Sequence, residues 1–318
     1  MKTAFVFPGQ GAQYIGMAQD FLAEDATLAA VLDDFDREHN TDLRSIMMGG
    51  PEEALKETRF TQPAILFHSM CALSAFRKHL GQKTLGESDP TILKPDFVAG
   101  HSLGEFTALA AAGVVDLKAA MHLVHKRGEF MIRANAGVPF AMSAIIGLSE
   151  ADVIAVCAEA ESEGLVRAVN FNTPIQTVIS GTEAGVTKAS ELAKEKGAKR
   201  VIPLVVGGPF HTPLIGQASA WLDEELQRFH LNPALVPVVS NVDALPSVDP
   251  IEIRHKLVDQ IISPVRWVQC VQYMIDQGVR RFVEFGPQKV LSGMIKNIDK
   301  DAVVLNLDKL SDVPVALQ

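Results

Sequence analysis

Short apolar runs alternate with longer segments of helical periodicity over the first 135 residues. The run at 3–7 predicts a buried strand that stops at Pro8-Gly9-Gln10-Gly11. The alternation predicts a parallel sheet flanked by helices. The elements expected here are a second strand at 97–99 and helices over 16–39, 62–79, 103–112 and 116–135.

The order of predicted strands and helices changes in residues 140–206. The pattern is strand, helix, strand, strand, helix, strand, which is the ferredoxin-like arrangement. Glycine and proline mark its two joints, at 137–139 and 207–209. The expected elements are strands over 141–148, 166–171, 176–180 and 200–206 and helices over 149–162 and 182–196. We therefore expect a small ferredoxin-like domain, residues 137–206, inserted into a larger discontinuous domain formed by 1–136 and 207–318.

The last hundred residues return to strand–helix alternation. We expect helices over 214–229, 250–262 and 266–277, strands over 236–242, 281–285 and 303–305, and a final helix after Gly286-Pro287. The fold class predicted from the whole pattern is α/β. The larger domain is expected to resemble an α/β hydrolase, with a parallel sheet.

Composition and charge exclude several classes of protein. The chain has 318 residues, 47% of them apolar and 21% charged, which is typical of a globular protein with a large core. With 29 basic and 38 acidic side chains the net charge is −9, which argues against general binding to nucleic acid or to a membrane surface. No apolar run approaches the length of a membrane span, and the first is too short for a signal peptide. A cytoplasmic location is expected.

Gly100-His101-Ser102-Leu103-Gly104 carries the strongest chemical signal. It follows an apolar run and precedes an alanine-rich helical segment. A G-x-S-x-G sequence in this context is typical of a nucleophile elbow, where a tight turn raises the serine hydroxyl at the start of a helix. The flanking glycines permit a turn that a Cβ would obstruct. Ser102 is the candidate nucleophile, and a glycine-flanked turn without chemistry is the alternative.

A serine nucleophile needs a base, usually histidine, within hydrogen-bond reach. Of nine histidines, His211 lies between an expected strand and an expected helix, in Gly207-Gly208-Pro209-Phe210-His211-Thr212-Pro213. Such neighbours favour a rigid loop that presents a side chain, and a turn histidine without chemistry fits the sequence equally well. His101 is expected to point away from the site and to serve in packing or hydrogen bonding.

Neither the other histidines nor the cysteines predict a metal site. His122 and His125 are spaced i, i+3 on an expected helix, but a metal needs more ligands than this pair, so we expect them on the surface. Cys71, Cys157 and Cys270 are far apart and form no C-x-x-C, which argues against a metal knuckle or a disulfide framework.

Acyl transfer also needs hydrogen-bond donors for the oxyanion that forms at the attacked carbonyl. The N–H of Leu103 is one candidate, and the loop Pro8-Gly9-Gln10-Gly11 offers others, although a plain glycine turn also explains that loop.

Arg127 lies on the helix after the elbow. If it faces inward, its fork can hold a carboxylate, and a solvated surface group is the alternative.

These pieces together resemble the malonyl-CoA:acyl-carrier-protein transacylase family, over nearly the whole chain. The motifs that carry the resemblance are Phe5-Val6-Phe7-Pro8-Gly9-Gln10-Gly11-Ala12-Gln13, Gly100-His101-Ser102-Leu103-Gly104-Glu105, Arg127-Gly128, Asn170-Phe171-Asn172-Thr173-Pro174, Pro209-Phe210-His211, Gln260-Ile261-Ile262-Ser263-Pro264-Val265-Arg266-Trp267 and Glu284-Phe285-Gly286-Pro287. The family's fold is a larger α/β domain with a ferredoxin-like insert, which agrees with the pattern above.

The resemblance implies a role for each candidate. Ser102 would be acylated, and His211 would take its proton. The N–H groups of Gln10 and Leu103 would form the oxyanion hole, and Arg127 would bind the malonyl carboxylate.

It also implies a set of supporting residues. The histidine would be oriented by a backbone carbonyl near Gln260, so no catalytic Asp or Glu is expected. Met131 and Asn172 match positions that line the acyl pocket. Phe210 and Leu103 agree with malonyl-selective members.

The implied reaction is ping-pong transfer of a malonyl group from malonyl-CoA to the phosphopantetheine thiol of acyl carrier protein, feeding fatty-acid biosynthesis. No metal or redox cofactor is expected, and the chain is expected to be a monomer. The alternatives are an acyltransferase of a polyketide or malonate decarboxylase pathway, a serine hydrolase or thioesterase, and a non-enzymatic module that binds a carrier protein.

Two surface features complete the picture. A basic cluster in the small domain is a hypothetical contact for the acidic carrier protein, and a solvated helix face is the alternative. Its residues are Lys188, Lys194, Lys196, Lys199 and Arg200. The polar stretch 81–95 looks longer than is usual in the family, and is expected to extend a surface loop without altering the chemistry.

Overall fold

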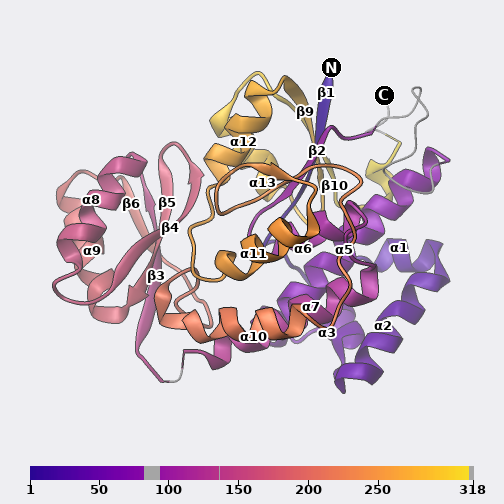
Figure 1. Cartoon of the computed structure of the whole chain (residues 1–318), viewed down its shortest axis with the longest axis horizontal. Helices are drawn as coiled ribbons and strands as arrows, with labels where there is room; N and C mark the ends of the chain where they lie inside the picture. The colour runs from indigo at the N-terminus through magenta and orange to yellow at the C-terminus, as the bar shows by residue number, and fades with distance from the viewer. Residues whose placement is uncertain (82–93, 136, 315–318) are drawn as a thin grey trace.

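The computed structural model describes residues 1–81, 94–135 and 137–314, which form two sheets with their helices. In Figure 1 the smaller sheet, with α8 and α9, lies at the left, and the larger sheet with the remaining helices forms the rest of the molecule. The expected α/β fold with a parallel-rich sheet is confirmed.

The larger sheet has six strands in the order β10-β9-β1-β2-β7-β8. All its pairs are parallel except β7 with β8. The strands are β1 (Lys2–Phe7), β2 (Phe97–Gly100), β7 (Val238–Val239), β8 (Pro246–Ser247), β9 (Val279–Phe285) and β10 (Val303–Leu307). Because β1 and β2 are parallel neighbours, the loops that follow their carboxyl ends meet at one edge of the sheet.

Both faces of this sheet are covered. In β1, Phe5 and Phe7 face one apolar core, while Ala4 and Val6 face a second core that contains Trp267. Residues that are buried on both faces explain why the strand is a continuous apolar run. The helices that precede the smaller sheet in the chain are α1 (Gln19–Glu24), α2 (Ala26–His39), α3 (Leu43–Gly49), α4 (Glu52–Lys56), α5 (Thr58–His79), α6 (Leu103–Ala111) and α7 (Leu117–Arg133). Those after it are α10 (Gly216–Leu226), α11 (Pro250–Gln260), α12 (Trp267–Asp276) and α13 (Val290–Ile298).

The smaller sheet is antiparallel, with strand order β4-β5-β3-β6. Its elements in chain order are β3 (Phe140–Ile146), α8 (Glu150–Ala160), β4 (Val166–Thr173), β5 (Gln176–Thr182), α9 (Glu183–Glu195) and β6 (Arg200–Pro203). The two helices pack on one face, around Val153, Val166 and Ile179. Met142 and Val178 on the other face join the core of the larger sheet.

A backbone bridge ties the two sheets together. Val265 N donates to Val169 O at 2.8 Å, and Phe171 N donates to Val265 O at 3.0 Å. Strand β4 is therefore fixed to the segment between α11 and α12.

Most of the predicted elements are present, and the errors occur where local signals are weak. The segment predicted as one helix over 16–39 is two helices, because Asp25 is extended and accepts a hydrogen bond from Thr27 N at the start of α2. The strand predicted at 236–242 is only Val238–Val239. Helices α3 and α4 and strand β8 were not predicted, since each has seven residues or fewer. The predicted loop at 81–95 lies largely outside the described residues.

Gly104 shows how closely the elbow packs on β1. A Cβ at this position would lie 2.0 Å from the carbonyl oxygen of Phe7, where only backbone atoms could yield. We expect Gly104→Ala to lower the free energy of unfolding by about 3 kcal/mol or more. Gly293→Ala is the matched control, since a Cβ there meets no atom within 4 Å, and we expect it to raise that energy by about 0.5–1 kcal/mol. Urea unfolding measures both, and a Gly104→Ala protein as stable as the parent would contradict the close approach.

Candidate active site

Ser102 occupies a strained turn between β2 and α6. Its backbone has φ 52° and ψ −105°, a conformation that L residues rarely adopt. His101 N donates to Phe7 O at 3.0 Å, so the elbow is anchored to the end of β1. The turn raises the Ser102 side chain at the amino end of α6, where backbone N–H groups carry a partial positive charge.

His211 faces this serine from the loop after β6. Its Nε2 lies 2.9 Å from Ser102 Oγ, and its Nδ1 lies 2.9 Å from the carbonyl oxygen of Gln260. A carbonyl can only accept, so Nδ1 carries the proton and Nε2 presents its lone pair to the serine. Burial, and then the charge of Arg127, lower the pKa of His211 to about 3, so the ring is neutral at pH 7.

Arg127 faces inward from α7, with 1% of its surface exposed. Its Nη2 donates to Ser102 Oγ and to Gln260 Oε1, both at 3.0 Å, and its Nη1 donates to Gln62 Oε1 at 2.9 Å. Its Nε is buried with no acceptor among the described residues. Burial lowers the pKa of Arg127 to about 10, and the group remains a cation at neutral pH. A buried cation with a free donor beside a serine hydroxyl suits an anionic acyl group.

Two further residues hold this arrangement, and the sequence analysis gave neither a role. Asn241 accepts from Ser102 N at 2.7 Å and donates from Nδ2 to Gly100 O at 2.7 Å, so it clamps both sides of the elbow. Glu105 accepts from Asn241 N at 3.0 Å and from Gln260 Nε2 at 2.6 Å. Burial raises the pKa of Glu105 to about 7. Glu105 stands inside the elbow motif and could have been suspected, whereas Asn241 has no local signal.

A cavity of about 250 Å³ lies over Ser102, between the two sheets. Its walls include Gln10, Leu103, Arg127 and His211 together with three residues that the resemblance singles out: Met131 and Asn172, expected in the acyl pocket, and Phe210, which agrees with malonyl-selective members. Within the part of the chain that the structure describes, the backbone N–H groups of Gln10 and Leu103 have no acceptor. Gln260 is fully buried behind Arg127 and does not line the cavity.

Three other histidines had specific predictions. His101 lines the cavity, but it does not contact Ser102 Oγ: its Nε2 lies 2.8 Å from Asn172 Oδ1 and its ring packs near Trp267. The prediction that His122 and His125 are surface residues is wrong. His125 is 2% exposed, and the His122 side chain is 13% exposed beside Glu225. Helices α2 and α10 pack against α7 and cover both, and the sequence of α7 alone does not show this.

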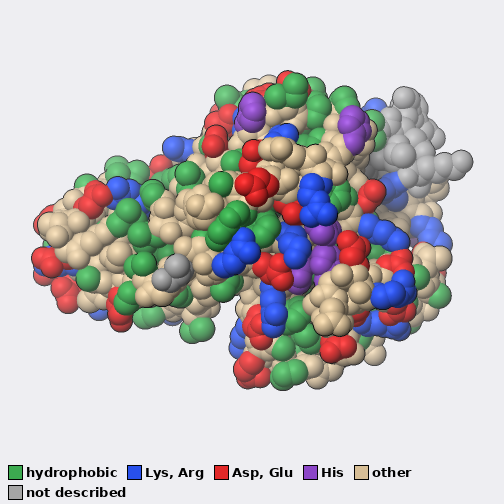
Figure 2. Space-filling model, turned by 60° about the horizontal axis from the view of Figure 1, so that its bottom comes forward, with side chains coloured by type: hydrophobic (Ala, Val, Ile, Leu, Met, Phe, Trp, Pro, Cys, Tyr) green, Lys and Arg blue, Asp and Glu red, His purple; other side chains and the backbone are tan. Residues whose placement is uncertain are grey.

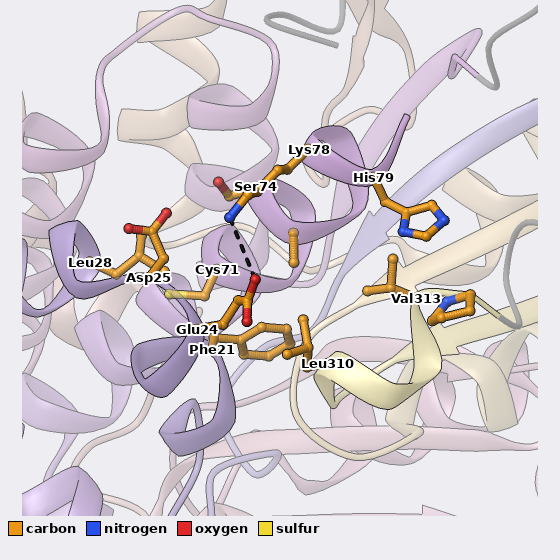
Figure 3. Close-up of a pocket in the computed structure, with 12 residues that line it drawn as sticks. Phe21, Glu24, Asp25, Leu28, Cys71, Ser74, Lys78, His79, Leu310 and Val313 are labelled. Carbon is orange, nitrogen blue, oxygen red and sulfur yellow. Dashed lines mark ion pairs between the residues drawn. The ribbon is translucent and has the colours of Figure 1, made fainter. Parts of the chain in front are cut away.

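A second cavity, of about 300 Å³, is drawn in Figure 3. Its walls come from α1, α2, α5 and the segment around Leu310, with Lys78 and Glu24 paired at 3.6 Å across it. It contains none of the predicted site residues, so we place the chemistry in the smaller cavity over Ser102.

The α/β fold, the serine elbow and its histidine define an acyl-transferring enzyme. A family model described as "Acyl transferase domain" matches residues 4–309. The chain is 42% identical, over 100% of its length and 96% of the relative's, to "Malonyl CoA-acyl carrier protein transacylase" of Bacillus subtilis (strain 168).

Solved structures agree with this. The acyl-carrier-protein S-malonyltransferase of Burkholderia pseudomallei superimposes with a TM-score of 0.91 at 42% identity, with 100% of this chain and 99% of that one covered. A malonyl-transacylase solved in complex with a type II PKS acyl-carrier protein gives a TM-score of 0.92 at 36% identity, with coverage of 100% and 99%. This chain belongs to the acyl transferase family and is an acyltransferase. Within the described ranges, we find no helix with the length and apolar character needed to cross a bilayer.

Asn241→Ala tests whether the amide clamp holds the elbow. The change leaves the buried Ser102 N–H and Gly100 carbonyl without partners, each at a cost of about 1–3 kcal/mol. We expect a lower free energy of unfolding in urea, and a fall in kcat of about tenfold or more because Ser102 is no longer fixed. Asn232→Ala on the exposed surface is the control. Unchanged stability and kcat in Asn241→Ala would show that the clamp is dispensable.

Proposed function

We propose that the chain transfers a malonyl group from malonyl-CoA to the phosphopantetheine thiol of acyl carrier protein, through a malonyl ester on Ser102. The observation that carries this proposal is the buried guanidinium of Arg127, whose Nη2 lies 3.0 Å from Ser102 Oγ. A serine esterase for neutral acyl groups has no use for a buried cation at that distance, whereas a malonyl thioester ends in a carboxylate.

In the first half-reaction His211 acts as the base. Its Nε2 takes the proton of Ser102 as Oγ attacks the thioester carbonyl, and the carbonyl oxygen becomes an oxyanion. We assign the backbone N–H groups of Gln10 and Leu103, two residues of the cavity wall, as the donors to this oxygen. When the anion collapses, the carbon–sulfur bond breaks, His211 returns the proton to the leaving sulfur, and malonyl-Ser102 and free coenzyme A result.

The second half-reaction reverses the roles. His211 takes the proton of the pantetheine thiol, the thiolate attacks the serine ester, and Ser102 Oγ regains the proton as it leaves. The Gln260 carbonyl holds the imidazole through both steps and stabilises the transient imidazolium. We propose no metal or redox cofactor for these steps, because each is a proton transfer coupled to acyl transfer.

Arg127 gives the reaction its preference for an acid. Two of its nitrogens are fixed by Gln62 and Gln260, so the guanidinium meets the substrate in one orientation. Burial is the largest cause of the low pKa of His211, and the positive charge of Arg127 is the second. A carboxylate bound to Arg127 neutralises that charge. We infer that a malonyl substrate makes His211 a stronger base than a neutral acyl substrate does. Met131 and Phe210 close the pocket around the short acyl chain.

The supply of malonyl groups to fatty-acid biosynthesis is the pathway that these relatives support best. One structural relative is bound to a type II PKS acyl-carrier protein, and a polyketide pathway is the second candidate for that reason alone. A serine hydrolase or thioesterase of the α/β-hydrolase type would place a carboxylate on His211 Nδ1. Here that nitrogen donates to the backbone carbonyl of Gln260, which disfavours the hydrolase.

We also propose the domain division expected from the sequence, with residues 137–206 as a ferredoxin-like insert between 1–136 and 207–318. The βαββαβ order and the strand order β4-β5-β3-β6 support it.

A cytoplasmic monomer remains our proposal, in keeping with the acidic composition and three buried free cysteines.

Intact mass spectrometry after mixing with malonyl-CoA tests the chemistry. We expect the parent to gain one malonyl group, Ser102→Ala to gain none, and Arg127→Ala to lose the preference for malonyl-CoA over acetyl-CoA, by about a hundredfold in kcat/KM. His255→Gln, at an exposed position on α11, is the control and should behave as the parent. An adduct on Ser102→Ala, or an unchanged preference in Arg127→Ala, would contradict the assignment. Rapid release of malonate without an acceptor would favour the hydrolase.

The carrier protein is proposed to dock beside β6. A groove there shares Met142, Leu204 and Val206 with the cavity over Ser102, and Val205 on its rim is fully exposed. Lys194, Lys199 and Arg200 are exposed around this edge, and Lys196 lies 3.8 Å from Glu159.

Charge reversal tests this surface. We expect the double variant Lys196→Glu, Arg200→Glu to raise the KM for an acidic carrier protein about tenfold and to leave the KM for malonyl-CoA unchanged, because rim charges steer docking. The matched control is the double variant Lys2→Glu, Lys300→Glu. Lys2 begins β1 and Lys300 shortly precedes β10, so both lie at the amino ends of these strands, opposite to the ends that carry the site. An unchanged KM for the carrier protein in the first variant would rule the surface out.

A further inference from the structure

Three histidines gather between α2, α7 and α10, away from the cavity over Ser102. The ring of His39, at the end of α2, has its centroid 4.9 Å from that of His122 and 4.6 Å from that of His125. The three helices lie along the bottom of Figure 1, and Figure 2 shows histidine side chains gathered among acidic and basic ones on the face seen from that side. Malonyl transfer makes no use of this cluster.

The state of His122 is set by one strong contact. Its Nε2 lies 2.7 Å from Glu225 Oε1, so this nitrogen carries a proton and donates it to the carboxylate. In the neutral ring, Nδ1 then carries no proton and presents a lone pair. It is buried without a hydrogen-bond partner among the described residues, and it lies 3.3 Å from Glu38 Oε1. A lone pair and a carboxylate oxygen repel each other at that distance unless a cation lies between them.

His39 supplies a third donor atom. Its Nε2 is also buried and has no hydrogen-bond partner in the described chain. One ring nitrogen of His39, one of His122 and one Glu38 oxygen form a set in which every pair of atoms lies within 4.8 Å.

We propose that Glu38, His39 and His122 bind a divalent transition-metal ion of the Zn²⁺ type. Ligands about 2.1 Å from a tetrahedral ion are about 3.4 Å apart, which is close to the His122–Glu38 separation and needs only a small movement of His39. Glu225 orients His122 in the way that a carboxylate behind a zinc-bound histidine does. Water would complete the fourth position.

Such an ion would join the end of α2 to α7, the helix that also carries Arg127. The sequence argument against a metal at His122 and His125 counted only one helix, and the additional ligands come from α2. The ion has no part in acyl transfer, so this proposal stands independently of the proposed function.

Calorimetric titration of the chain, without an affinity tag and stripped of metal by a chelator, with ZnCl₂ tests the site. We expect one equivalent to bind to the parent, and the affinity to fall at least tenfold in His39→Gln and in Glu38→Gln. Glu38 is exposed, so Glu38→Gln should fold, and His39→Gln replaces a half-buried ring by a polar side chain of similar length. His255→Gln, a histidine outside the cluster, should bind as the parent does. Co²⁺ should give the visible absorption of a tetrahedral ion in the parent and in His255→Gln only.

Saturating Zn²⁺ should raise the Tm of the parent by about 5 °C at a hundredfold excess over Kd, and should leave that of His39→Gln unchanged. Malonyl transfer by Glu38→Gln without metal should equal that of the parent. Failure of the parent to bind one equivalent would overturn the proposal and leave a proton as the cation between His122 and Glu38. Parent-like affinity in either His39→Gln or Glu38→Gln would also overturn it.

Discussion

The buried charge of Arg127 is the constraint on which the rest of the site depends. An unpaired guanidinium in a protein interior is costly, and the two Nη atoms of this one donate to oxygens from three segments, those of Ser102, Gln62 and Gln260. Gln260 in turn donates to Glu105 and accepts from His211 through its carbonyl. The cation, the nucleophile and the base are therefore held by one hydrogen-bond network. The carboxylate of the proposed malonyl substrate would balance the charge of that network.

Sheet topology explains how distant residues reach this network. The parallel pairing of β1 with β2 brings the loop that contains Gln10 beside the Ser102 elbow, and the close packing of Gly104 on Phe7 fixes their separation. The smaller sheet supplies the opposite wall, because it turns Met142 and Val178 toward the cavity. The hydrogen bonds of Val265 to β4 then hold this sheet against the segment between α11 and α12. The site is thus an interface between two sheets.

Much of this was accessible from the residues themselves. The glycines around Ser102 and the Gly-Pro sequence before His211 indicated two unusual turns, and both residues have positive φ. These signals are local, since a backbone conformation depends on a few adjacent residues. The orientation of Arg127, by contrast, remained open, since a helix with an arginine on either face is consistent with the same periodicity. The role of Asn241 was not found at all, because its partners lie 139 and 141 positions away.

The sequence by itself determined the α/β fold, the elbow, the histidine loop and, through its motifs, the family. The fold, the elbow and the histidine loop follow from short-range hydrophobic periodicity or from turn residues that act within a few positions, whereas the family follows from the resemblance of the motifs. Only the tertiary structure decided that Arg127 faces Ser102 and that Glu105 and Asn241 support the elbow. It also decided that His39 lies beside His122 in a separate cluster. These facts depend on which helix faces pack together, and that is settled by burial over the whole chain rather than by any one segment.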